Sequence, residues 1–444
     1  RLHYSTDFEG SIYGNTLNDT FDIAGKPRRI GPSSDIGAHE WQLTPDQNGV
    51  LYVKKGANGF GSSWNDATSE LAEGIYYMNM CDKGRLNSSE PNPILHGVNE
   101  IWVSAGTYKP QFGNVIEDDR FGPDDLIYFD GYDPTSPRAE FFFPTNTKIF
   151  GGFPNTGNPV KADRNWKTNP TILSGDLNNN DTSTGFGSNL VLENRTDNSY
   201  NIFVMSGDAG VSVLDGLQFK GGNASINESM MLDNNLYDGT SSFYSGVGGA
   251  GKIKIYSGSM DIVNCVFKEN FAIGNSSDQK GGGALFIDTY QSSINIVNTL
   301  FESNKSNQQG GALDLGDVYS DLKIINSTLT GNLSNTQGGA IALNTNTQTV
   351  YLQNSIVFGN VSTIANTQSF TTAVPTTTFI RQNNLIEGSS LTTNGNINAT
   401  GVLLANLFKS VDRTNADYLQ LTNNAVAKNA GNNSLYLATF PTSD

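Results

Sequence analysis

The chain has 444 residues, a formal net charge of −16, 16% charged residues and 48 glycines, a composition typical of a turn-rich, mostly β protein. Its acidic balance argues against nucleic acid and anionic membranes as partners, because both would repel it. No apolar run approaches the length that spans a bilayer, and Arg1 opens the chain without a Met or a signal-peptide core, so we expect a mature or excised segment and no membrane insertion.

The first part of the chain is expected to precede the main fold. Residues 44–98 are predicted to form a capping region. In the capping region, helical spacing is shared by four apolar residues: Ala67, Leu71, Ile75 and Met78. Asn65 or Asp66 would cap the start of this amphipathic helix. Because the raw end of a stacked sheet pairs with any extended chain, the helix is predicted to cover that end.

Strand patterns then follow over residues 99–423. Alternating apolar residues and turn residues predict early strands in four segments: 99–108, 144–153, 170–177 and 211–223. The pattern is clearest between residues 248 and 363. Residues 424–444 are expected to begin a closing segment.

Acidic residues cluster in an insertion between these early strands, at residues 109–138. Its aspartates are Asp118, Asp119, Asp124, Asp125, Asp130 and Asp133. Carboxylates on glycine- and proline-punctuated backbone suit Ca²⁺, which makes calcium the one cofactor to consider. A solvated acidic loop explains the same residues. The sequence DLNNND at 176–181 begins like an EF-hand loop, but it lacks the glycine at the sixth position and the acid at the twelfth.

A repeat dominates the middle of the chain. The phrases GGAGKIK, GGALFID, GGALDLG and GGAIALN begin at Gly248, Gly282, Gly310 and Gly338, at spacings of 34, 28 and 28 residues. Two series of asparagines share these spacings: Asn264, Asn298, Asn326 and Asn354, followed by Asn270, Asn304, Asn332 and Asn360. A period of this length is typical of a stacked repeat in which no unit buries its apolar face alone.

Aligning the repeats brings like apolar residues together. One column is Ile253, Ile287, Leu315 and Leu343, and another is Ile262, Ile296, Ile324 and Leu352. The near-continuous apolar interior and the Gly-Gly corners predict an all-β fold, a right-handed parallel β-helix or solenoid with inserted loops. The first asparagine series, from Asn264 to Asn354, is predicted to be a structural ladder that satisfies corner peptides. A ligand-binding ladder is the alternative. Cys265 lies in a small-residue column and is expected to be a buried free thiol.

Two further sets of residues are functional candidates. Tyr256, Tyr290 and Tyr319 fall at equivalent places in successive repeats, where they would stack on sugar rings or on one another. Asp288 and Asp314, with Asp261 nearby, are the best pair for a glycosidase and are expected at outward strand positions. Lysines such as Lys252 are interpreted as solvated edge charges. Between Tyr200 and Ile380 there is no Arg or His to serve a uronate lyase.

In order and spacing, these blocks resemble a family. The run LYVKKGANGFGSSWNDATSELAEGI, then EIWVSAGTYKP, IFGGF, NPTILSGDL, LDGLQFKGGN and the GGA repeats, is similar over residues 51–360 to the secreted right-handed β-helix repeat surface proteins of Bacteroidota. The resemblance implies the fold, whereas most such proteins have no assigned catalysis. It also implies that residues 1–43 are the tail of a preceding module or a terminal hairpin, which a structural charge cluster of Arg28 or Arg29 with Asp35 and Glu40 holds together.

The ends of the chain bear on module organisation. The family's closing motif is split here, with DIAGKPRRIGPSSDIGAHE at 22–40 and NAVAKNAGNNS at 424–434. The resemblance therefore implies one repeat of a longer tandem array, cut out of register with its modules; a permuted arrangement is the alternative. We expect an extracellular, non-catalytic structural or adhesive module of a surface filament used in attachment or gliding, with neighbouring modules and surface polysaccharide as partners. A β-helix that binds or cleaves a polysaccharide is the other function class.

Overall fold

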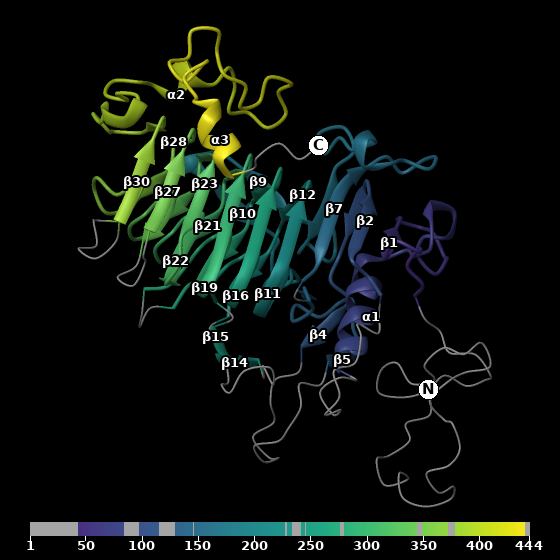
Figure 1. The fold of residues 1–444 in the computed structure, drawn as a ribbon. Helices are drawn as coiled ribbons and strands as arrows, with labels where there is room; N and C mark the ends of the chain where they lie inside the picture. Colours follow the sequence, from purple (N-terminus) through teal and green to yellow (C-terminus); the bar gives the residue numbers. More distant parts are fainter. Residues whose placement is uncertain are drawn as a thin grey trace, which may run out of the picture.

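The computed structural model describes residues 43–83, 97–114, 129–144, 146–226, 229–232, 241–244, 246–275, 279–343, 349–371 and 378–439. Within them the protein is mostly β, and its long strands pair in parallel (Figure 1). The terminal hairpin predicted for residues 1–43, with Arg28, Arg29, Asp35 and Glu40, falls outside the described residues apart from position 43. No helix in the described ranges is long and apolar enough to cross a membrane.

The first sheet contains twelve of the described strands. Its main path is β1 (Val50–Val53), β2 (Glu100–Ser104), β7 (Lys148–Phe153), β11 (Phe203–Asp215), β16 (Gly251–Val263), β19 (Leu285–Val297), β23 (Leu322–Ile325), β27 (Thr349–Gln353) and β30 (Thr378–Gln382). Three short strands attach to it: β6 (Phe141–Phe142), β22 (Leu313–Val318) and β26 (Ile341–Leu343).

Two smaller parallel sheets accompany the first. The second contains β3 (Gly106–Tyr108), β8 (Thr171–Ser174), β12 (Leu217–Lys220), β17 (Val266–Lys268), β20 (Leu300–Glu302), β24 (Thr328–Thr330), β28 (Ile356–Phe358) and β31 (Leu385–Ile386). The third contains β13 (Asn223–Ala224), β18 (Phe271–Ala272), β21 (Lys305–Ser306), β25 (Leu333–Ser334) and β29 (Val361–Ser362). From β11 onward the chain passes through the first, second and third sheets in this order, and then returns to the first.

Insertions outside these sheets form antiparallel hairpins and short helices. The hairpins are β4 (Phe112–Asn114) with β5 (Phe129–Tyr132), β9 (Thr182–Thr184) with β10 (Val191–Glu193), and β14 (Ser229–Leu232) with β15 (Ser241–Tyr244). The 3-10 helices are η2 (Trp64–Asp66), η3 (Lys161–Asp163), η4 (Gly187–Asn189) and η5 (Thr393–Gly395).

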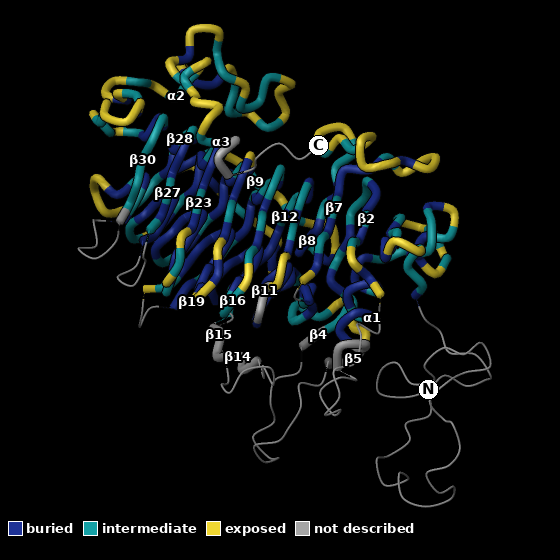
Figure 2. The backbone as a smooth tube through the Cα atoms, viewed as in Figure 1, coloured by how far each residue is buried: buried dark blue, intermediate teal, exposed yellow. Residues whose placement is uncertain are grey.

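Strand register places identical or similar apolar residues directly over one another. One column of fully buried residues crosses the first sheet: Leu51, Ile101, Ile149, Leu214, Ile262, Ile296, Ile324 and Leu352. The predicted column of Ile253, Ile287, Leu315 and Leu343 is confirmed by the same pairings. Each such side chain stabilises the fold by about 1.5–3 kcal/mol through burial. Figure 2 shows this burial along the strands, with exposed residues concentrated in loops.

Aromatic residues continue the core along the second sheet. The rings of Phe219 and Phe267 stack with centroids 4.7 Å apart, and those of Phe267 and Phe301 at 4.9 Å. Offset stacking of this kind adds to the energy of burial. Cys265, beside this stack, is a free thiol that is 1% exposed, as predicted, and its burial raises its pKa to about 12. A nearly neutral thiol in such a site is a packing residue.

The two asparagine columns have different roles. Asn264, Asn298, Asn326 and Asn354 all have φ between 50° and 54°, and they form the turn from the first sheet to the second. Asn298 donates its side-chain amide to Asn264 Oδ1 at 2.5 Å, and Asn326 is exposed. Asparagine tolerates this left-handed backbone better than most residues, so the column is selected chiefly by conformation.

The continuous side-chain ladder lies in the second asparagine column. In Asn270, Asn304, Asn332 and Asn360 each Nδ2 donates to Oδ1 of the next at 2.9 Å. Each Oδ1 that accepts this bond also accepts the backbone N–H of the preceding asparagine. These residues are at most 3% exposed. The ladder expected for the Asn264 column is therefore found six residues later along the chain, where the corner is buried and its peptide groups have no water to bind.

The capping helix begins later than expected. α1 spans Leu71–Lys83, and its buried residues Leu71, Ile75 and Met78 belong to the main core as predicted. The predicted cap at Asn65 or Asp66 is wrong, because both lie in η2. The carboxylate of Asp66 instead accepts hydrogen bonds from Phe60 N at 3.2 Å and Ser62 Oγ at 2.6 Å, which tie it to the preceding loop. In Figure 1, α1 lies at the β1–β2 end of the first sheet.

A separate apolar cluster covers the other end of the stack. It contains Phe358, Leu385, Ala399, Leu407, Phe408 and Ala425. Leu407 ends the short helix α2 (Leu404–Leu407), which Figure 1 places beside β28 and β30. A further helix, α3 (Asn433–Thr439), follows. Phe358 of β28 and Leu385 of β31 alternate with the core residues Val357 and Ile386, so this cluster covers the opposite face of the last strands of the second sheet.

Candidate functional site

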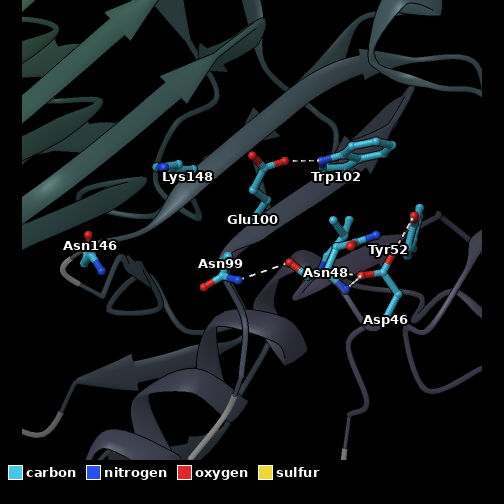
Figure 3. Close-up of a pocket in the computed structure, with 9 residues that line it drawn as sticks. Asp46, Asn48, Tyr52, Asn99, Glu100, Trp102, Asn146 and Lys148 are labelled. Atoms are coloured by element: carbon cyan, nitrogen blue, oxygen red, sulfur yellow. Dashed lines mark hydrogen bonds between the residues drawn. The ribbon is translucent and has the colours of Figure 1, made fainter. Parts of the chain in front are cut away.

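A hollow of about 500 Å³ opens on the outer face of the first sheet, near the β1 end (Figure 3). We call it the N-terminal hollow. It is lined by Asp46, Asn48, Val50, Tyr52, Asn99, Glu100, Trp102, Asn146 and Lys148. Its volume is within the range of small-molecule sites, about 300–1,000 Å³.

Strand alternation directs these side chains outward. In β1, Leu51 and Val53 point into the core and are 0% exposed, so Tyr52 between them points to the outer face. The same alternation applies to Trp102 in β2 and Lys148 in β7. Register places Tyr52 opposite Trp102, and Glu100 opposite Lys148. Three strands that are distant in sequence thus contribute to one surface.

Aromatic rings form one wall of the N-terminal hollow. The rings of Tyr52 and Trp102 meet edge to face, with centroids 5.5 Å apart. Trp102 also stacks on Phe153 at 4.9 Å and 17°. Tyr52 meets Trp64 at 5.1 Å, again edge to face. These contacts fix the two wall residues before any ligand arrives.

Asp46 shapes the turn that enters β1. Its Oδ1 accepts the backbone N–H groups of Asn48 at 2.8 Å and Val50 at 2.9 Å, and its Oδ2 accepts the Tyr52 hydroxyl at 3.1 Å. Burial, with the hydrogen bond and charge of Asp46, raises the pKa of Tyr52 to about 12. Tyr52 therefore stays a neutral donor at physiological pH.

Both carboxylate oxygens of Glu100 also have partners. Its Oε2 accepts Trp102 Nε1 at 2.7 Å, and its Oε1 pairs with Lys161 Nζ at 2.8 Å. Lys148 differs from Lys161, because its ammonium group has no ion pair or hydrogen bond within the described residues. Asn99 donates to Asn48 O at 3.1 Å, and Asn146 accepts Val211 N at 3.1 Å through Oδ1. Lys148 Nζ and the Asn146 amide N–H₂ are donors left to meet a ligand.

None of these lining residues was identified from sequence. The available signal was the outward position in each early strand, which carries Tyr52 in LYVKK, Trp102 in EIWVSAG and Phe150 in IFGGF. Alternation alone marks such residues as outward. The pairing of β1 with β2, some 50 residues apart, decides that they meet.

The tyrosine candidates form a stack along the first sheet. Tyr256 and Tyr290 have ring centroids 5.1 Å apart, and Tyr290 and Tyr319 lie at 5.2 Å, with interplanar angles of 18° and 26°. Tyr290 and Tyr319 are 37% and 42% exposed. Their faces pack on one another, so stacking between neighbours already accounts for the column.

The carboxylate candidates occupy outward positions but are buried. Asp314 is 0% exposed and accepts Gly281 N at 2.5 Å, while Asp288 is 7% exposed and accepts Asp317 N at 2.8 Å. Burial raises the pKa of Asp288. Asp261 accepts Asn295 Nδ2 at 2.8 Å, and burial raises its pKa too. Asp288 and Asp314 therefore occupy outward strand positions, but loops cover them and their carboxylates anchor the loop backbone.

Lys252 also differs from its expected setting. It was interpreted as a solvated edge charge, but it is 0% exposed. Burial lowers its pKa, against the opposing charge of Glu140. Its strand neighbours in register, Val204 and Phe286, are buried as well, so this part of the outer face is covered.

Most of the calcium candidates lie outside the described residues. These are Asp118, Asp119, Asp124 and Asp125. Asp130 is in β5, and Asp133 accepts Thr135 N at 3.0 Å and Thr135 Oγ1 at 2.7 Å, which lowers its pKa. The described residues hold no group of three or more metal-ligating side chains. Calcium binding by the insertion stays a prediction.

A buried charged cluster joins three parts of the chain on the outer side of the second sheet. Glu269 accepts Ser183 Oγ at 2.5 Å and pairs with Lys220 at 3.2 Å and Arg413 at 3.3 Å. Burial would raise the pKa of Glu269, but these partners outweigh it and hold the pKa below its ordinary value. The Tyr418 hydroxyl donates to Glu302. The cluster ties the β9–β10 hairpin and the C-terminal segment to the sheet.

Asp181 and Arg195 complete this charged cluster. Arg195 Nη2 lies 3.4 Å from Asp181 Oδ2, and Arg195 Nη1 donates to Glu269 O at 2.6 Å. Burial raises the pKa of Asp181 to about 6, against the charge of Arg195 and a hydrogen bond from Asn198. The hydrogen bonds among these groups point to a structural clamp between loops.

Comparisons of this chain with protein-family models, with curated proteins and with solved structures found no match.

Proposed function

We propose that the parallel sheets are the faces of one right-handed parallel β-helix, and that this scaffold serves as a non-catalytic structural and adhesive module at a bacterial cell surface. The order of the strands supports the first part, because the chain visits the first, second and third sheets in the same sequence on successive turns. Parallel crossovers of this kind are right-handed in about 98% of cases.

The observation that carries the functional part is the use of polar residues inside the stack. Asn304 and Asn332 bind each other and the backbone, and Asp314 holds the N–H of Gly281. Side chains that would serve chemistry in an enzyme are here spent on holding successive turns together. A rigid rod of this type suits a spacer that presents a surface to a partner.

The location and partners rest on the sequence resemblance. It favours an extracellular module that is joined to neighbouring modules and faces surface polysaccharide. Cleavage of that polysaccharide is the other function class. Its candidate carboxylates, Asp288 and Asp314, accept backbone hydrogen bonds and are covered by loops, which disfavours them as acid and base.

The test measures adhesion and cleavage on the same surfaces. Beads coated with the folded chain are held under flow on glass that carries neutral or acidic polysaccharides, and reducing ends released into the buffer are assayed. Retention without release is expected, and beads coated with heat-unfolded chain should wash away. Release of product that is lost in both Asp288→Asn and Asp314→Asn, or no retention on any surface, would contradict the proposal.

A further inference from the structure

We infer that the N-terminal hollow binds an acidic saccharide, with Lys148 facing the carboxylate of the sugar. This inference rests on the proposed adhesive function and names the class of ligand that such a module would hold. It depends on the hydrogen-bond inventory of the hollow, on its aromatic wall and on its shape.

The acids of the hollow already have partners within the protein. Asp46 accepts two backbone N–H groups and the Tyr52 hydroxyl, and Glu100 accepts Trp102 Nε1 and pairs with Lys161 Nζ. Lys161 balances the charge of Glu100, whereas Asp46 is held by neutral donors.

The donors of the hollow are available instead. Lys148 has no ion-pair partner within the described residues, although the chain as a whole carries a charge of −16. Asn48 is exposed at the rim, and Asn146 uses only its Oδ1 on Val211 N, which leaves an amide N–H₂ to donate. An ammonium and two amides facing one space favour an anion with several oxygen acceptors.

The aromatic wall favours a sugar over a small inorganic anion. Tyr52 and Trp102 line the same hollow and are held by contacts with Trp64 and Phe153. Aromatic surfaces pack against the C–H groups of a sugar ring, and a space of about 500 Å³ is large enough for one or two rings. Figure 3 shows Lys148 and Asn146 on one side of Glu100, and Asp46 and Tyr52 on the other.

The test is calorimetric titration of the full chain with a hexamer of galacturonic acid and, in parallel, with a hexamer of galactose. We expect binding of the acidic hexamer that weakens as salt rises, because the key contact is between exposed charges. Lys148→Met should raise the Kd about tenfold or more, since it removes a charge-assisted hydrogen bond. Asn48→Asp, which adds a negative charge at equal size, should raise the Kd as well.

The matched control is Lys323→Met. Lys323 lies in the same outward row of the first sheet, on β23, and is reached from Lys148 through the in-register residues Val213, Asp261 and Asn295. It should leave binding unchanged. If Lys148→Met fails to fold by circular dichroism, Asn48→Asp still decides the question, because Asn48 is an exposed residue in a turn.

Three results would overturn the inference: no binding of the acidic hexamer, equal binding of the neutral one, or equal Kd values for Asn48→Asp and the parent chain. Beads that are still retained under flow without product release would then leave the proposed adhesive function in place. Loss of retention together with intact hexamer binding would contradict the proposed adhesive function and leave the saccharide site in place.

Discussion

At the scale of single residues, asparagine is used in two physically distinct ways. In the column of Asn326 it supplies a left-handed turn, with φ of 50°, in contact with water. In the column of Asn332 it supplies buried hydrogen bonds. Asn332 Oδ1 accepts both Asn304 N and Asn304 Nδ2, and its Nδ2 donates to Phe301 O and Asn360 Oδ1. The two asparagine columns, six positions apart in sequence, should therefore tolerate different substitutions.

Asn332→Ala is predicted to lower the free energy of unfolding by about 2–4 kcal/mol. It leaves Asn304 N buried without its acceptor and removes one donor from Phe301 O, and a buried polar group left unpaired costs about 1–3 kcal/mol. Chemical denaturation followed by circular dichroism measures the change.

Substitution of Asn326 is predicted to cost less stability than substitution of Asn332. Asn326→Ala should cost about 1 kcal/mol through the left-handed backbone alone, and Asn326→Gly should restore most of it. Asn332→Gly should be no better than Asn332→Ala. A glycine rescue at 332 would show that the buried ladder is not what that position provides.

At the scale of elements, the sheets are tied to their surrounding loops by charge. Arg413, from the C-terminal segment, reaches Glu269 at 3.3 Å and Ser183 at 2.8 Å on the β9–β10 hairpin. Asp181, just before that hairpin, faces Arg195. Because these groups are removed from water, their protonation is coupled to whether the loops are docked.

The raised pKa of Asp181 predicts that the stability of the fold depends on pH. Its pKa is raised to about 6 in the folded chain, against an ordinary 3.8, so between these values the folded state binds more protons than the unfolded state. Stability from this group is therefore full below pH 4 and falls as the pH rises to about 6. Melting temperatures measured from pH 4 to 7 should fall more steeply for the parent chain than for Asp181→Asn.

Other buried acids also have raised pKa values, so the difference between the two chains is the informative quantity. Burial also raises the pKa of Asp261, Asp288, Glu302 and Glu387. These groups remain in both proteins and cancel in the comparison. Parallel pH profiles for the parent and Asp181→Asn would contradict the assignment.

At the scale of the whole molecule, the repeat was predictable and the candidate site was not. The period of the GGA phrases specified which residues meet, as in Ile296 over Ile324, because equal spacing in sequence becomes equal height in a stack. The N-terminal hollow has no such period. Tyr52, Trp102 and Lys148 come from strands of unequal spacing. Burial of Asp314 and the late start of α1 at Leu71 depend on loop contacts that alternation does not encode.

The ends of the stack decide whether it remains a single particle. At the C-terminal end, Leu352 lies opposite Arg381, so the apolar column of the first sheet stops at a charged residue. The cluster around Leu407 then covers Phe358 and Leu385 of the second sheet. Charged side chains at a strand edge and segments that cover a sheet both hinder pairing of that sheet with another chain.

Leu407→Asp is predicted to promote self-association, because it places a charge in this cover and exposes the apolar side chains of Phe358 and Leu385 beneath it. Leu407 is 0% exposed, so the change is not tolerated in place. Size-exclusion chromatography with light scattering should show oligomers that the parent lacks. Leu403→Asp is the control, because Leu403 lies just before α2 and is 62% exposed. The Leu403→Asp variant should remain monomeric. Equal masses for both variants would show that the cover is dispensable.

Equivalent rows pair over a fixed interval, and this limits how such a chain changes in length. Excising residues 310–337, one interval of 28, would join Gln309 to Gly338 and bring Ile341 opposite Leu285, where Leu313 now lies. Asn360 would likewise replace Asn332 beside Asn304. An indel of one or two residues within a strand would instead displace every later row. The fold should therefore tolerate the loss or gain of a whole 28-residue interval better than that of one or two residues.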